Sequence, residues 1–169
     1  MQKIQLSLTL VIFLTLIGCD RSGRLPGLVP ASGTVTFNGA PVEEATVIFV
    51  PDSVESNMRS ASATTDAKGK FTLATLQHAD GAYPGSYKVT VTKTLTTGDL
   101  VWEESANDPG RGRLIDTQMV ADMLPAKYGN ENTSDLTVDI PPKGSRNLVL
   151  DLSGEVDSKP RKPDTRAGR

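Results

Sequence analysis

The sequence predicts an all-β protein whose folded part is a β-sandwich of about seven strands. Short segments rich in Val, Ile, Thr and aromatic residues alternate apolar with polar side chains, and clusters of Gly, Pro, Asn or Asp separate them. The chain has one cysteine and one histidine, which excludes an internal disulfide and a zinc site of the usual Cys/His spacing. Packing alone therefore has to hold the core.

The length of the chain limits the number of domains, and its charge limits the kinds of partner it can bind. The 169 residues leave room for one domain once an export signal and flexible ends are set aside. The 18 Lys and Arg residues nearly balance the 20 Asp and Glu residues, for a net charge of −2, and no aromatic residues interleave with basic ones. We therefore expect no nucleic acid partner.

The N-terminus has the order of a secretory signal peptide. Lys3 gives a short positive start, and residues 4–17 are almost entirely apolar. A helix of about 14 residues would rise only about 21 Å, which is short of the roughly 30 Å hydrocarbon core of a bilayer. This segment is predicted to be a removable signal.

The signal runs directly into Leu16-Ile17-Gly18-Cys19, which resembles the lipobox of bacterial lipoproteins. The resemblance implies cleavage after residue 18 and acyl chains of the palmitate type on Cys19, which would hold the chain at a membrane. The alternative is an ordinary signal peptide with an incidental cysteine. Asp20 is similar to an inner-membrane retention signal of enterobacteria, so both the cell membrane and the outer membrane stay open, with the domain facing the periplasm or the cell exterior.

The two ends of the mature chain are predicted to be flexible. Residues 19–30 are polar and rich in Gly and Pro, as in a tether, and residues 154–169 form a charged tail with too little apolar surface to fold. The alternative for the tail is contact with anionic lipid or a cell-wall polymer through its basic residues, which are Arg161, Lys162, Arg166 and Arg169.

Residues 31–153 form the predicted domain. Asn38-Gly39 and the turn from Asp66 to Gly69 separate strands, and Pro84-Gly85 introduces the clearest one, in which Tyr87, Val89 and Val91 alternate with polar residues. The predicted strands are 34–37, 45–50, 59–65, 71–73, 86–94, 136–140 and 148–152.

These turns and strands carry a second resemblance. The runs Gly33-Thr34-Val35, Asn38-Gly39-Ala40-Pro41-Val42, Thr65-Asp66, Gly69-Lys70-Phe71 and Pro84-Gly85-Ser86-Tyr87 look like the carboxypeptidase regulatory-like, or transthyretin-like, domain. Leu124-Pro125-Ala126-Lys127-Tyr128 is similar to small single-domain lipoproteins of planctomycete-type bacteria. The resemblance implies a seven-stranded prealbumin-like (Ig-like) sandwich, and because its motifs are turns and core strands, it implies no activity.

One long insertion interrupts the domain at residues 95–127. Its first half, 95–112, is predicted to be a surface loop. In its second half Asp116 is expected to cap a short helix, because Met119 and Met123, and Val120 and Leu124, are four residues apart. Long loops on a rigid scaffold often carry binding residues, and Trp102 lies in this one.

No residue pattern predicts catalysis, a metal or a cofactor. His78 lies in a polar loop, and the chain has no Gly-x-Ser-x-Gly elbow. The Asp66 turn lacks the alternating oxygen ligands of a calcium loop, and Glu43-Glu44 is expected to be a solvated bend. A relative of the transthyretin-like sandwich acts in urate breakdown, but its C-terminal Tyr-Arg-Gly-Ser motif is absent.

Two function hypotheses follow. The first is a non-catalytic interaction or structural module of the cell envelope, with membrane lipid bound through acylated Cys19 and an envelope protein or glycan as its partner. The alternative is a carbohydrate-binding module, in which Trp102, Tyr83 and Tyr128 are the candidates for stacking on sugar rings.

Overall fold

The computed structural model describes residues 25–52, 58–108, 110–156 and 159–163. The predicted signal peptide and residues 19–24, which are the first half of the predicted tether and include Cys19, lie outside the described residues, as do Arg166 and Arg169. Within these ranges, no helix is long and apolar enough to cross a membrane.

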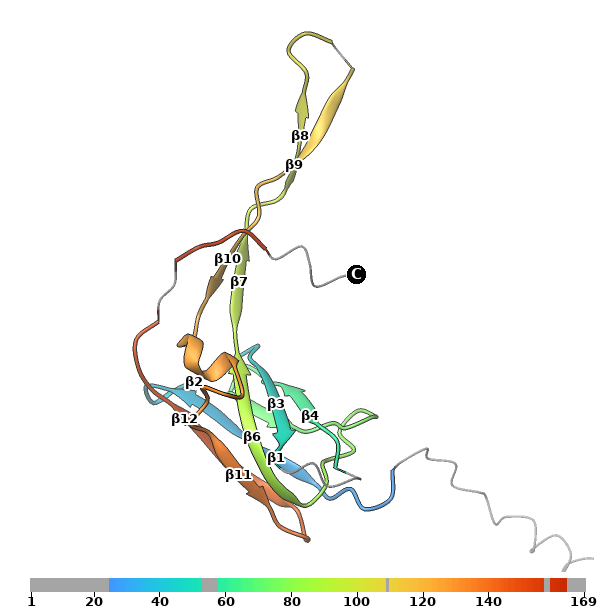
Figure 1. Cartoon of the computed structure of the whole chain (residues 1–169), viewed down its shortest axis with the longest axis vertical. Helices are drawn as coiled ribbons and strands as arrows, with labels where there is room; N and C mark the ends of the chain where they lie inside the picture. Colours follow the sequence, from blue (N-terminus) through green and yellow to red (C-terminus); the bar gives the residue numbers. More distant parts are fainter. Residues whose placement is uncertain (1–24, 53–57, 109, 157–158, 164–169) are drawn as a thin grey trace, which may run out of the picture.

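The described chain is all-β, with two four-stranded sheets, two two-stranded ribbons and a short 3-10 turn, η2, at Ala126–Gly129 (Figure 1). In the first sheet β1 (Ala31–Phe37) pairs with β12 (Ser145–Leu152) in parallel and with β2 (Ala40–Pro41) and β5 (Lys70–Thr72) antiparallel. The second sheet is antiparallel, in the order β11 (Thr137–Ile140), β6 (Gly85–Thr92), β3 (Thr46–Pro51) and β4 (Ala61–Thr64). The predicted fold class, all-β, is therefore confirmed.

The two sheets share one hydrophobic core. Tyr87, Val89 and Val91 of β6 alternate with polar residues, and their side chains are at most 1% exposed. The ring centroid of Phe49, on β3, lies 5.7 Å from that of Tyr87 and 6.1 Å from that of Phe71, which belongs to the other sheet. The alternation predicted for 86–94 therefore identifies the core face of this strand.

The predicted turns form where positive φ angles are needed. Asn38 and Gly39, with φ angles of 50° and 82°, join β1 to β2. At the next turn, Oδ1 of Asp66 accepts hydrogen bonds from the backbone N–H groups of Lys68 and Lys70, both at 2.8 Å. Short polar side chains and glycine thus close both turns.

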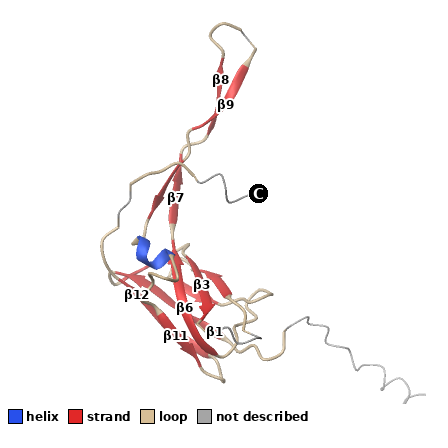
Figure 2. Cartoon of the chain, in the orientation of Figure 1, coloured by secondary structure: helices blue, strands red, loops and turns tan. Residues whose placement is uncertain are grey.

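The insertion is a β-hairpin arm, defined here as residues 94–122. Its inner ribbon pairs β7 (Thr94–Thr97) with β10 (Met119–Asp122), and its outer ribbon pairs β8 (Leu100–Glu104) with β9 (Gly112–Asp116). Because β7 continues the direction of β6, the arm projects from the end of the two sheets (Figure 2).

The prediction of a loop followed by a helix is therefore wrong. Residues 119–122 form a strand. Residues four apart share a face in a strand as well as in a helix, so their spacing alone does not distinguish the two structures. The described residues hold twelve strands rather than about seven, because β2 and the four strands of the arm were not predicted.

The described part of the C-terminal tail contacts the arm. Arg161 forms an isolated antiparallel bridge with Val120, with N···O distances of 2.7 and 2.9 Å, and its side chain binds Asp122. The expectation of a freely solvated tail does not hold at Arg161, because a backbone bridge and a charge pair act together there.

Candidate functional site

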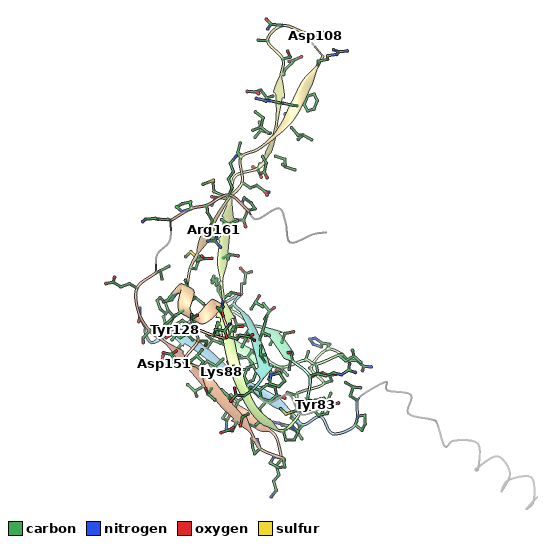
Figure 3. The ribbon with its side chains drawn as sticks, viewed as in Figure 1. Tyr83, Lys88, Asp108, Tyr128, Asp151 and Arg161 are labelled. Carbon is green, nitrogen blue, oxygen red and sulfur yellow. The ribbon has the colours of Figure 1, made fainter. Side chains whose placement is uncertain are left out.

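The outer ribbon of the arm has two faces with different chemistry. The pairs Leu100–Asp116, Trp102–Leu114 and Glu104–Gly112 lie on one face, which we call the Trp face. The opposite face carries the pairs Val101–Ile115 and Glu103–Arg113. Figure 3 shows the side chains of the outer ribbon standing clear of the two sheets, with Asp108 near the far end.

The apolar side chains of the Trp face are open to solvent. Leu100, Trp102 and Leu114 are 60%, 58% and 62% exposed. Burying three such side chains would be favourable by several kcal/mol, at roughly 25 cal/mol for each Å² of apolar surface. A contiguous exposed apolar patch of this kind is typical of an interaction site.

Gly112 allows Trp102 to lie across the ribbon. A Cβ atom added to Gly112 would come within 2.5 Å of Cε2 of Trp102 and 2.6 Å of its Cζ2. The indole therefore occupies the space that a side chain on residue 112 would fill. This packing holds the ring over Gly112, the residue that pairs with Glu104, and leaves Trp102 58% exposed.

The two faces also differ in charge. On the opposite face Nε and Nη2 of Arg113 both lie 3.0 Å from Oε2 of Glu103, which neutralises that carboxylate. On the Trp face, Glu104 accepts the N–H of Gly110 at 3.0 Å, and Asp116 accepts the N–H of Gln118 at 2.8 Å. Within the part of the chain that the structure describes, neither of these two carboxylates has a cationic partner, so the Trp face is apolar and acidic.

Gly98 and Thr117 fix the junction between the inner and outer ribbons. Gly98 has a φ angle of 87°, and a Cβ atom there would lie 2.5 Å from the carbonyl oxygen of Thr117. The hydroxyl of Thr117 accepts the N–H of Asp99 at 3.1 Å and donates to its carbonyl at 2.6 Å. The outer ribbon is thus joined to the inner one through hydrogen-bonded backbone.

The base of the arm is tied to the C-terminal tail. Nη1 and Nη2 of Arg161 lie 2.6 and 3.1 Å from the two carboxylate oxygens of Asp122, and this pairing raises the pKa of the Arg161 guanidinium. A shallow cleft beside this pair is lined by Lys93 and Asn130 among others. Arg161 is already paired within it, so the cleft offers a weaker site than the Trp face.

The three aromatic candidates are not brought together. Tyr128 is 2% exposed, and its hydroxyl donates to the carbonyl of Ser153 at 3.2 Å, so no face of its ring is free for stacking. Tyr83 is half-buried, and both tyrosines lie on the body formed by the sheets, away from the outer ribbon (Figure 3). Trp102 alone is exposed.

Among the described residues, no group of three or more His, Cys, Asp and Glu side chains is placed to hold a metal ion. His78 is exposed in the loop after β5. The buried carboxylate of Asp80 accepts the backbone N–H groups of Thr75, Leu76 and Gln77 at 2.6 to 3.1 Å, which closes that loop. Asp80 therefore has a structural role.

No protein-family model, curated protein or solved structure matches the chain significantly.

Proposed function

We propose that this chain is a membrane-anchored, extracytoplasmic lipoprotein that acts as a non-catalytic interaction module at the cell envelope. Acyl chains on Cys19 hold it at the cell membrane or the outer membrane, and residues 19–30 tether the domain, which faces the periplasm or the cell exterior. The arm presents the contact surface to an envelope partner.

The motif Leu16-Ile17-Gly18-Cys19, directly after an apolar segment, supports the anchor. Each buried CH₂ group contributes about 0.8 kcal/mol, so two or more acyl chains give stable attachment, which one chain reaches only marginally.

The exposed apolar band on the outer ribbon is the single observation that carries the interaction role. An isolated two-stranded ribbon is at best marginally stable in water, and Leu100, Trp102 and Leu114 contribute nothing to the core of the sheets. Burial against a partner gives these residues a physical role.

We regard the two four-stranded sheets as a prealbumin-like sandwich that resembles carboxypeptidase regulatory-like domains, with the arm inserted after β6. The turn at Asn38-Gly39 and the strand after Pro84-Gly85 support this assignment. The sandwich then serves as the rigid support of the arm.

A carbohydrate-binding module is the alternative. The observation that favours it is the exposed Trp102, whose indole lies over Gly112, since an exposed ring can stack on a sugar. Binding of envelope polysaccharides that is lost in Trp102→Ala and kept in Trp102→Phe would support this alternative over a protein partner.

The proposed function is tested in the native cells with the full chain. Wild type and Cys19→Ser are compared for metabolic acyl labelling and membrane fractionation, and we expect the variant to lose both the label and the membrane association. If Cys19→Ser keeps both, the anchor is wrong.

The interaction role has its own test. After chemical crosslinking in cells, partners that copurify with wild type should be lost from the combined variant Leu100→Ser, Trp102→Ser and Leu114→Ser. The control Val149→Ser changes another exposed aliphatic residue, on β12, and should retain them. Equal capture by both variants would place the binding surface elsewhere.

A further inference from the structure

We propose that the Trp face binds an extended peptide segment in which two basic residues, four positions apart, flank an apolar residue. This inference rests on the proposed function, because it specifies the partner of the same arm. It follows from the spacing of charge and apolar surface on the outer ribbon.

The two unpaired carboxylates lie at opposite ends of the apolar patch. Glu104 is opposite Gly112, and Asp116 is opposite Leu100, so the two side chains are four positions apart along the ribbon. At about 3.3 Å per residue this separation is about 13 Å. Leu114 and Trp102 face each other between them.

An extended partner matches this spacing. Side chains on one face of a strand recur every second residue, so residues at positions one and five of a segment are also about 13 Å apart. If both are Lys or Arg, each reaches one carboxylate, and an apolar residue at position three lies over Trp102 and Leu114. The charge-assisted bonds then fix the register of the segment on the ribbon.

Trp102 strengthens one end of this site. Its indole lies over Gly112, the residue that pairs with Glu104, and Trp102 is 58% exposed. A cation that binds the Glu104 carboxylate can therefore also contact the face of the indole, a favourable cation–π arrangement. The same end would repel an acidic segment.

The charge distribution disfavours the other occupants. Two copies packed through their Trp faces would bring four carboxylates together without a cation, because Arg113 lies on the opposite face and is paired with Glu103. A bilayer would have to take up Glu104, together with the ion pair between Asp108 and Arg111 at the far end of the arm. The dimer contact and the bilayer contact would each bury charged groups without a new partner of opposite charge, which is unfavourable.

The test titrates the full chain, in non-ionic detergent, into fluorescein-labelled peptides followed by anisotropy. The probe has the sequence Gly-Lys-Thr-Leu-Thr-Lys-Gly, and the matched peptide carries Glu in place of both Lys residues. We expect saturable binding of the basic peptide that weakens with salt, and no binding of the acidic one.

Variants assign the binding to the Trp face. The double variant Glu104→Gln/Asp116→Asn should weaken binding roughly tenfold, and Trp102→Leu roughly two- to fivefold. The control Glu43→Gln/Asp52→Asn makes the same charge change at exposed positions outside the outer ribbon and should leave the affinity unchanged.

Each outcome decides the proposal. It is overturned if both peptides bind equally, if the control weakens binding as much as the double variant, or if the basic peptide does not bind at all. It is also overturned if the Trp face instead gives a dimer or binds phosphatidylcholine vesicles independently of Glu104 and Asp116. If one of these results is obtained while partner capture in cells still depends on the arm, only the proposed peptide specificity is wrong. If partner capture in cells does not depend on the arm either, the proposed interaction role is wrong as well.

Discussion

Arg161 and Asp122 form a two-bonded ion pair that joins the C-terminal tail to the inner ribbon of the arm. The pair stands next to the backbone bridge between Arg161 and Val120, so a side-chain contact and a backbone contact reinforce each other. The tail therefore braces the arm close to where it leaves the sheets.

Loss of this brace should loosen the inner ribbon. In Arg161→Ala we expect the amide of Val120, which donates to the carbonyl of Arg161 at 2.7 Å, to exchange with solvent a few-fold faster. Hydrogen exchange read by NMR measures this directly. Lys162→Ala removes a neighbouring exposed cation and is the control; equal acceleration in both variants would show that the ion pair does not stabilise the bridge.

The packing of Trp102 on Gly112 should be visible in fluorescence, since the chain has a single tryptophan. Gly112→Val fills the space that the indole occupies, so we expect the ring to be displaced and its quenching by acrylamide to increase. Arg113→Val changes the next residue, on the opposite face, and should leave quenching near the wild-type value. No change in Gly112→Val would contradict the placement of the indole.

A charged substitution on the core face of β6 should strongly lower the free energy of unfolding. Val89 is fully buried, so Val89→Asp places an unpaired carboxylate in the core and should cost about 4 kcal/mol or more, or prevent folding. Val149→Asp makes the same change at a side chain that is 71% exposed, and its unfolding free energy should stay within about 0.5 kcal/mol of wild type. Chemical denaturation distinguishes the two, and similar losses would mean that the faces are wrongly assigned.

Asp66 predicts part of the acid dependence of stability. Backbone hydrogen bonds from Lys70 and Lys68 hold the pKa of Asp66 below its usual value. Because this pKa is lower in the folded chain than in the unfolded one, ionised Asp66 stabilises the fold above the unfolded value of about 3.9, and the contribution is lost as pH falls through the lower folded value.

Asp66→Asn keeps an acceptor oxygen but does not titrate, so its unfolding free energy should fall less steeply than that of wild type between about pH 5 and pH 2. Denaturant titrations at a series of pH values test this. Glu43→Gln, at an exposed carboxylate with no hydrogen-bond partner among the described residues, should retain the wild-type slope. The account of the turn fails if Asp66→Asn follows wild type as well.

The core of the fold was predictable because its signals are local. The alternation of Tyr87, Val89 and Val91 marks a half-buried strand, and Asn38-Gly39 marks a hairpin turn. The parallel pairing of β1 with β12 was not predictable, since it joins segments more than one hundred residues apart through their backbones.

The arm was missed because its strands do not alternate. Leu100, Val101 and Trp102 are consecutive apolar residues, as expected where neither face meets a core, and the four-residue spacing of Met119 and Met123 fits a helix as well as a strand. The available signal was local: apolar residues at 100–102 and 114–115 lie on either side of Asp108-Pro109-Gly110, a turn sequence.

The candidate site was predicted only at Trp102. Glu104, Leu114 and Asp116 join it through the register of β8 and β9, which the spacing of residues in the sequence does not define. Tyr83 and Tyr128 are candidates by residue type alone. Tyr128 is not available to a ligand, because it is buried and its hydroxyl is hydrogen-bonded to the backbone of Ser153.

Site-specific photo-crosslinking tests the central claim, that the Trp face is where the anchored chain meets its partner. A photoreactive amino acid replaces either Leu114 or Val149, which are 62% and 71% exposed, in the full chain in native cells. We expect an adduct of defined mass from position 114 that is lost when Glu104→Gln/Asp116→Asn is added, and no such adduct from position 149. The same adducts from both positions, or none from position 114, would contradict the account.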